Sequence, residues 1–259
     1  MIRRILHAAA LALAFAQAGT AARAAEEVVA ALSQDRVSIS TSFDGSEILV
    51  YGAIKRTAPA APTPPLGVIV TVAGPDRPVV VRRKERRFGI WVNTQSLEIE
   101  RAPTFYAIAT SGPFAATLGT NGDRRFRITT PRTVSAPSTL PGPEAERFRR
   151  ALIRVRRDAG SFVSAEGAVD LREETLFSTR IALPANLTEG NYTTRIFLTR
   201  GGGVVDSHKT EIFVQKVGLE RFVYNLAHER PLFYGIASLV IAVVSGWLAS
   251  AAFGLLRRG

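Results

Sequence analysis

The side chains that usually carry catalysis are scarce in this sequence. It has no cysteine and three histidines, one of which, His7, lies in an N-terminal segment of targeting type. The lack of cysteine excludes disulfides, thiolate metal sites and cysteine nucleophiles. A Gly-x-Ser-x-Gly elbow, a phosphate-binding loop and a dinucleotide fingerprint are also missing. We therefore expect a protein that is not an enzyme, with no catalytic residues and no cofactor.

Asp206 and His208 come nearest to a metal site. They are two positions apart on a predicted strand, so both side chains fall on one face and could supply two ligands. The sequence indicates no third ligand, and we predict that no metal is bound.

A run of basic residues is the other group that could do chemistry. It lies at a predicted hairpin between two apolar strands, and its clustered donors could bind an anion or an acidic lipid. The alternative is a solvated turn whose charges discourage edge pairing. The five cationic residues of the run are Arg82, Arg83, Lys84, Arg86 and Arg87.

The overall charge does not point to a particular anionic partner. The chain carries 33 basic and 22 acidic side chains, a net charge of +11. Without the five arginines of the terminal segments, 28 basic side chains face 22 acidic ones, which leaves +6. That excess is mild for a body of this size and favours solubility. Because no recognition motif accompanies it, we expect no binding to nucleic acid.

The two ends of the chain predict its topology. Residues 1–24 combine Arg3 and Arg4 with an apolar stretch and the small-x-small pattern Ala22-Arg23-Ala24, as in a secretory signal peptide. An uncleaved signal anchor is the alternative. Residues 232–256 contain no charged residue and would form a helix of about 37 Å, long enough to cross a bilayer.

The charges beside this span indicate its orientation. Arg257 and Arg258, in the tail 257–259, place the C-terminus in the cytoplasm by the positive-inside rule. We expect a single-pass protein of the bacterial inner membrane, with residues 218–231 as a juxtamembrane segment and the body in the periplasm. The span either faces lipid alone or packs against a partner helix through Ser238, Gly246 and Ala249.

The exported body reads as mainly β. Residues 25–112 contain short segments rich in β-branched and aromatic residues, separated by turn formers, and predict an antiparallel β-sandwich. Residues 113–143 read as an irregular linker, and residues 159–217 form a second β block. Whether the two blocks form one sandwich or two is left open.

Between the blocks, residues 144–158 predict an amphipathic helix. Phe148, Leu152 and Val155 fall on one apolar face, while acidic residues begin the helix and arginines end it. The helix either packs across the sheet or lies on anionic lipid.

The most specific motif lies in the second block. Leu187, Gly190 and Tyr192 enter a predicted strand with the spacing of the tyrosine corner found in immunoglobulin-like sandwiches. The alternative is an ordinary tyrosine at the start of a strand.

Several segments together resemble a family of transmembrane proteins of Alphaproteobacteria. They are VSIST-x-FDGSEILVYGAIKR (37–56), GIWVN near Trp91, LPANLTEGNYTTRIFL near Tyr192, and the two terminal segments. The resemblance implies a signal peptide, a periplasmic β domain and a C-terminal transmembrane helix, and it brings no catalytic residues. The resemblance also implies that relatives are often encoded beside a sulfite-exporter type permease, which is an association and not a mechanism.

Two functional hypotheses follow from these patterns. In the first, a periplasmic, non-catalytic interaction module of immunoglobulin-like type is anchored in the lipid bilayer and contacts another envelope or membrane protein. In the second, the protein is an accessory subunit of an anion permease, and its basic loop collects an oxyanion.

Overall fold

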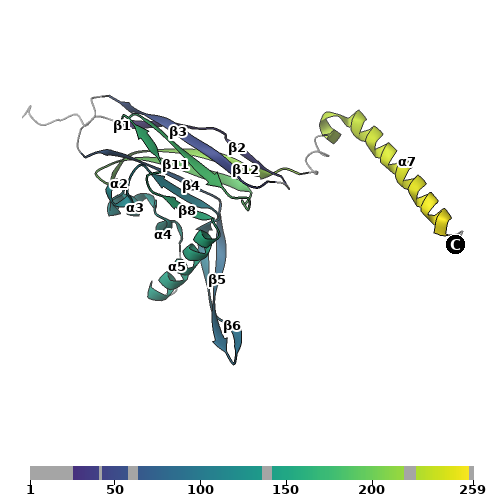
Figure 1. The fold of residues 1–259 in the computed structure, drawn as a ribbon, viewed down its shortest axis with the longest axis horizontal. Helices are drawn as coiled ribbons and strands as arrows, with labels where there is room; N and C mark the ends of the chain where they lie inside the picture. Colours follow the sequence, from purple (N-terminus) through teal and green to yellow (C-terminus); the bar gives the residue numbers. More distant parts are fainter. Residues whose placement is uncertain (1–25, 41–42, 58–63, 136–141, 219–225, 257–259) are drawn as a thin grey trace, which may run out of the picture.

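A computed structural model gives the fold of the chain (Figure 1). It describes residues 26–40, 43–57, 64–135, 142–218 and 226–256, with the side chains of the last segment described as far as residue 250. The predicted signal peptide, the cytoplasmic tail and part of the juxtamembrane segment lie outside the described residues. The described body is mainly β, as the sequence predicts.

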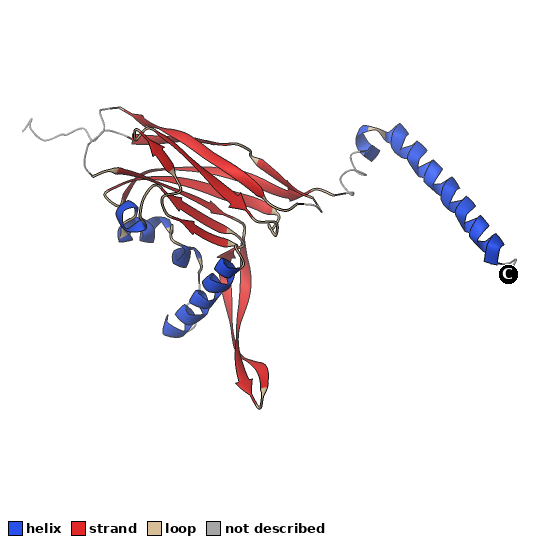
Figure 2. Cartoon of the chain, in the orientation of Figure 1, coloured by secondary structure: helices blue, strands red, loops and turns tan. Residues whose placement is uncertain are grey.

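Two sheets face each other in a sandwich (Figures 1 and 2). The smaller sheet has the order β1-β3-β10-β9, and the larger has the order β2-β12-β11-β4-β7-β8. The strands of the smaller sheet are β1 (Glu26–Leu32), β3 (Ser46–Arg56), β9 (Asp170–Arg172) and β10 (Leu176–Leu183). Those of the larger are β2 (Arg36–Ile39), β4 (Leu66–Ala73), β7 (Tyr106–Thr110), β8 (Phe162–Ala165), β11 (Gly190–Arg200) and β12 (Gly203–Lys216).

Each sheet mixes strands from both β blocks of the sequence. In the smaller sheet Val50 pairs with Thr179, and in the larger Val68 pairs with Leu198. Residues 25–112 and 159–217 thus share one sandwich, because alternate apolar residues of both ranges fill the same core.

Strand β4 is buried on both faces. Val68, Val70 and Val72 pack into the core between the sheets, whereas Ile69 packs into a second cluster on the outer face of the larger sheet. This double burial explains why the strand reads as a continuous apolar run rather than an alternating one.

Residues 113–143, predicted to be irregular, contain three short helices. They are α2 (Phe114–Thr117), α3 (Thr120–Phe126) and α4 (Thr130–Thr133). The Asp123 carboxylate accepts the Thr129 amide at 2.8 Å and pairs with Arg132 at 2.7 Å. These contacts between Asp123 and residues up to Arg132 fix the turn between α3 and α4. Because they are polar, the hydrophobic periodicity of the sequence does not reveal them.

Helix α5 (Gly142–Asp158) covers the predicted helical range, but its buried face differs from the prediction. Phe148 and Leu152 are buried as expected, whereas Val155 is exposed and Ile153 is buried instead. The helix meets two clusters at once: Phe148 packs with Leu97, and Leu152 with Ile153 joins the cluster outside the larger sheet. This dual contact turns the buried face toward Ile153.

Strands β5 (Asp76–Arg87) and β6 (Ile90–Pro103) form a separate two-stranded hairpin, here called the arm, which projects from the sandwich (Figure 2). The sequence predicted a hairpin at the basic run, and a hairpin is present, but its turn lies just after the run. The run lies inside β5, and the turn is made by Phe88 and Gly89. Because Gly89 tolerates a positive φ, the chain reverses there rather than among the charges.

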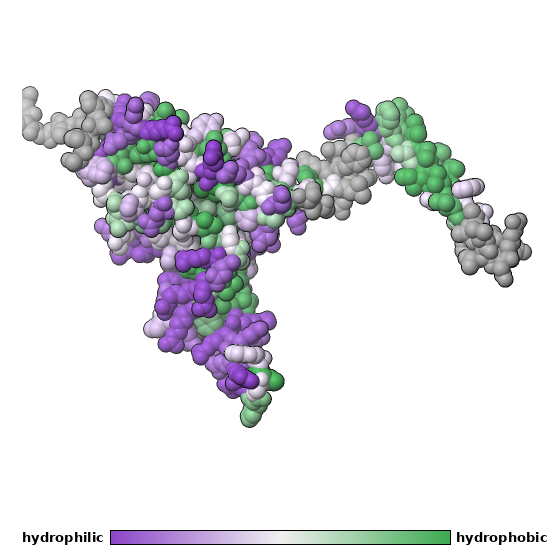
Figure 3. Space-filling view, in the orientation of Figure 1, coloured by the Kyte–Doolittle hydropathy of each residue, from purple (hydrophilic) through white to green (hydrophobic). Residues whose placement is uncertain are grey.

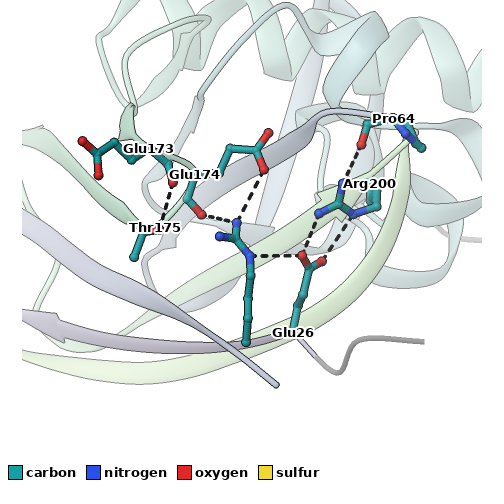
Figure 4. Close-up of polar contacts among 7 residues, drawn as sticks. Glu26, Pro64, Glu173, Glu174, Thr175 and Arg200 are labelled. Carbon is teal, nitrogen blue, oxygen red and sulfur yellow. Dashed lines mark hydrogen bonds and ion pairs between the residues drawn. The ribbon is translucent and has the colours of Figure 1, made fainter. Parts of the chain in front are cut away.

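A carboxylate at the first described residue holds β1 to the body. Glu26 accepts hydrogen bonds from Arg56 Nε at 3.3 Å and from an Arg200 terminal nitrogen at 2.6 Å (Figure 4). Arg56 also reaches Glu174, and Arg200 donates to the Pro64 carbonyl at 2.6 Å. The acid therefore links strands β1, β3 and β11.

Helix α7 (Pro231–Leu256) stands apart from the body (Figures 1 and 3). Its segment Pro231–Ser250 has a mean hydropathy of 2.0 and no burial against the rest of the described chain. An apolar helix of this length, with no protein cover, matches the thickness of a bilayer. The predicted span at residues 232–256 coincides with it to within one residue.

Candidate functional site

The end of the arm is a tight turn built around a bulky residue. Phe88 has a φ of 51° and Gly89 a φ of 85°, between Arg87 and Ile90, which pair with each other. Two positive φ angles are typical of a type I′ hairpin turn, where asparagine and glycine are preferred. A phenylalanine in this conformation is unusual, so local folding preference does not explain its presence.

The tip also exposes apolar side chains that a solvated hairpin does not need. Phe88 is fully exposed, and Ile90 and Trp91 are 64% and 68% exposed. Figure 3 shows apolar atoms at the end of the arm, beside strongly hydrophilic ones. Since such residues gain nothing in water, their exposure makes the tip a candidate contact surface.

A ladder of cations leads up to this tip. The register pairs Arg86 with Trp91, Lys84 with Asn93 and Arg82 with Ser96. Side chains alternate across a strand, so the three basic residues share one face of the arm with the indole at its distal end. Within the part of the chain that the structure describes, none of the three forms an ion pair with a carboxylate.

The cations of the opposite face of the arm have an acidic partner. Glu85 lies between Arg83 and Arg87, with nitrogen–oxygen distances of 2.9 and 3.5 Å. The two faces of one hairpin thus differ in kind: one carries paired charges, and the other carries a cationic ladder.

A groove of about 480 Å³ lies where the arm meets α5. Its apolar lining residues are Val81, Phe148 and Ala151, and most of the polar ones are basic. The polar lining residues are Arg82, Arg83, Lys84, Gln95, Glu144, Arg147 and Arg154. Such a site combines guanidinium donors for an anionic group with apolar cover beside them.

The structure separates the predicted site residues into three places. The five cations of the basic run lie together on the arm. Leu187, Gly190 and Tyr192 lie at the entry to β11, where the Tyr192 hydroxyl bonds to the backbone of Thr188. Ser238, Gly246 and Ala249 lie on one side of α7, because steps of 100° per residue bring them within about 80° of one another.

Asp206 has a structural role. Its carboxylate accepts the Val28 amide at 2.7 Å and so joins β12 to β1. Among the described residues, no group of three potential ligands surrounds a metal position.

Sequence reasoning missed the three exposed apolar residues as a site. It assigned Phe88, Ile90 and Trp91 to an ordinary strand, because aromatic and β-branched residues favour strands. The signal that identifies them is the Phe88-Gly89 pair between two long alternating segments, where glycine marks the turn.

Comparison with known proteins supplies the family. The sequence model of a family described as "Putative transmembrane protein (Alph_Pro_TM)" matches residues 27–254, which include the sandwich, the arm and α7. The chain belongs to this family. Membership of this transmembrane family agrees with the β body and the single apolar C-terminal helix.

Two further comparisons give little more. No curated protein matches the chain. Among solved structures, the crystal structure of the sporulation control protein Spo0M from Bacillus subtilis is similar at 12% identity and a TM-score of 0.25. The match covers 74% of this chain and 49% of that one, so the chain spans about half the length of Spo0M.

Proposed function

We propose that this protein is a single-pass inner-membrane protein whose periplasmic β-sandwich is a non-catalytic interaction module. The arm is its contact surface. The observation that carries the proposal is the exposure of Phe88, Ile90 and Trp91 at the end of a projecting hairpin. Apolar side chains held away from the core serve binding rather than folding.

The proposed orientation rests on the two ends of the chain. Helix α7 is apolar throughout, and Arg257 and Arg258 follow it in the sequence. Basic residues stay preferentially on the cytoplasmic side, which leaves the sandwich on the other side of the membrane. Protease added to spheroplasts should digest the body, whereas intact cells should protect it. Protection in spheroplasts contradicts the orientation.

The non-catalytic assignment rests on how the acidic groups are used. Asp123 bonds to backbone amides and Arg132, Asp206 bonds to the Val28 amide, and Glu26 pairs with two arginines. The contacts of these three carboxylates join parts of the fold, which favours a structural role for them over proton transfer.

Crosslinking in native membranes tests the contact surface. A photo-reactive amino acid replaces Trp91 in one variant and Val163, an exposed residue of the edge strand β8, in the control. We expect adducts with another envelope component from position 91 and few from position 163. Equal labelling of both positions, or none from position 91, contradicts the assignment of the arm.

A permease partner is the second candidate, and the small residues on one side of α7 favour it. Small side chains allow the backbones of two membrane helices to approach closely. Ser238→Leu with Gly246→Leu should abolish copurification of a permease, whereas Val240→Leu on another side of α7 should not. A permease retained by the double variant argues against helix packing.

A further inference from the structure

We infer that the arm binds the surface of an anionic phospholipid bilayer, with its tip in the interfacial layer and its cationic ladder over the headgroups. This inference rests on the proposed function, in which the arm is the contact surface, and it names the partner. The protein would then touch the membrane twice, through α7 and through the arm.

The shape of the tip favours a bilayer over a folded protein. Phe88 and Gly89 form a two-residue turn, so the apolar surface is a narrow convex point. A stable protein interface buries about 800 Å² on each partner, across a matching surface. A fluid interface needs no preformed pocket to receive a convex apolar point, and tryptophan is enriched at this depth of membranes.

The spacing of the charges along the arm fits the layers of a membrane surface. At about 3.3 Å per residue, Arg86 lies about 7 Å behind Phe88, and Lys84 about 13 Å behind it. Amphipathic elements bury their apolar part by about 5–10 Å, which brings Arg86 level with the phosphates. Lys84 then lies within about one Debye length of the charged surface.

The sign of the charge requires an anionic lipid. Five of the six residues from Arg82 to Arg87 are basic, and Glu85 is the one acid among them. On the ladder face, Arg82, Lys84 and Arg86 have no acidic partner among the described residues, so their field is available to headgroups. The groove at α5 adds Arg147 and Arg154 to the positive charge at the base of the arm.

Because α7 anchors the protein in the bilayer, even a weak contact between the arm and the membrane surface is enough for binding. Residues 217–230 connect the end of β12 to α7 and can span at most about 50 Å, so the body stays near the bilayer that holds α7. The twelve residues of β5 give the arm a length of about 40 Å. A tip that is already tethered binds as an intramolecular partner at high effective concentration.

The two tryptophans of the chain allow a direct test. Trp247 lies in α7, so Trp247→Phe leaves Trp91 at the tip as the single reporter. The full-length variant is reconstituted into vesicles of phosphatidylcholine alone, or with phosphatidylglycerol as about a third of the lipid. We expect blue-shifted Trp91 emission and roughly twofold weaker acrylamide quenching in the anionic vesicles.

Two triple variants, both made in the Trp247→Phe protein, distinguish the effect of the ladder residues from the effect of total charge. Arg82→Gln, Lys84→Gln and Arg86→Gln remove the ladder and should return Trp91 quenching to its value in neutral vesicles. The matched control removes three exposed arginines elsewhere on the sandwich and should retain the protection. The control positions are Arg36, Arg124 and Arg180.

The outcomes are distinct for the two proposals. If Trp91 is equally quenched in both kinds of vesicle while crosslinks from position 91 reach a protein, the bilayer inference fails and the contact surface stands. If Trp91 is equally quenched and position 91 gives no adduct in native membranes, both fail. Loss of protection in both charge variants also overturns the assignment of the ladder.

Discussion

The phenol oxygen of Tyr192 lies against the backbone of Thr188. It accepts a hydrogen bond from the Thr188 amide at 3.2 Å and donates one to the Thr188 carbonyl at 2.9 Å. The tyrosine is almost fully buried, with its ring centre 6.2 Å from that of Phe105. One side chain thus fixes the turn before β11 and fills the core between the sheets.

Removing this hydroxyl should loosen the turn while keeping the ring in place. Tyr192→Phe leaves a backbone amide and carbonyl without their partner, at a cost of about 1–2 kcal/mol. Thermal unfolding of the full-length protein in detergent, followed by circular dichroism, should show a melting temperature lower by about 3–6 °C. Tyr51→Phe, at an exposed position of β3, is the control and should change little.

Neutralising Glu26 should destabilise the body strongly. Glu26→Gln leaves the largely buried guanidinium groups of Arg56 and Arg200 without their shared charge partner. Breaking a buried ion pair of this kind costs about 3 kcal/mol. Glu27→Gln, which removes an exposed pair with Lys55, should cost less than about 1 kcal/mol in the same urea titration. Equal losses in the two variants would contradict a special role for Glu26.

Alkaline pH should weaken the fold through Tyr106. Burial raises the pKa of Tyr106 from 10.0 to about 12, and the nearby Arg195 guanidinium offsets part of this rise. Above pH 10 the unfolded chain loses the phenol proton while the folded chain keeps it, so unfolding becomes more favourable. The contribution of the neutral Tyr106 phenol to the free energy of unfolding is complete below pH 10. It falls by about 1.4 kcal/mol per pH unit toward pH 12.

Tyr106→Phe is the comparison that isolates this effect. The variant loses the hydrogen bond to the Ile128 carbonyl, so it should be less stable than the parent at neutral pH. Urea unfolding at increasing pH should show the gap between the two proteins shrinking above pH 10. If the difference in unfolding free energy between the two proteins stays constant to pH 11.5, the pKa of Tyr106 is not raised in the folded state.

A methyl group at Gly52 should not fit. A Cβ built there would lie 2.4 Å from the Val29 carbonyl oxygen and 2.6 Å from a ring carbon of Phe177. Because one neighbour is backbone and the other is a buried ring, Gly52→Ala should cost about 2–3 kcal/mol. Gly218→Ala, which meets nothing within 4 Å, is the control and should melt like the parent.

Local pattern was enough to predict elements whose stability is local or set by solvent. Residues 66–73 read as a short apolar β segment and residues 232–256 as a membrane span, and the structure has β4 and α7 there to within one residue. The first has strong β propensity, and the second has a composition that only lipid or a protein core accommodates. Both properties belong to the segment itself.

Features that depend on distant partners were not predictable in the same way. The pairing of Val50 with Thr179 is chosen by the shared core, and nothing near either residue specifies it. The burial of Ile153 rather than Val155 depends on two clusters that α5 meets only in the folded protein. The exposed tip was missed for a related reason, since Trp91 reads as a strand residue until the length of the arm is known.

The interleaving of the two β blocks determines when the chain can finish folding. Strand β3 lies between β1 and β10, and β4 between β7 and β11, so neither sheet closes before the strands after residue 176 are made. At a synthesis rate of about 5–20 residues per second, β10 follows β3 by on the order of 10 s. An unpaired apolar edge persists through that interval and is prone to aggregate. We therefore expect the sheets to be completed only after β10 to β12 have followed β3 and β4, shortly ahead of α7.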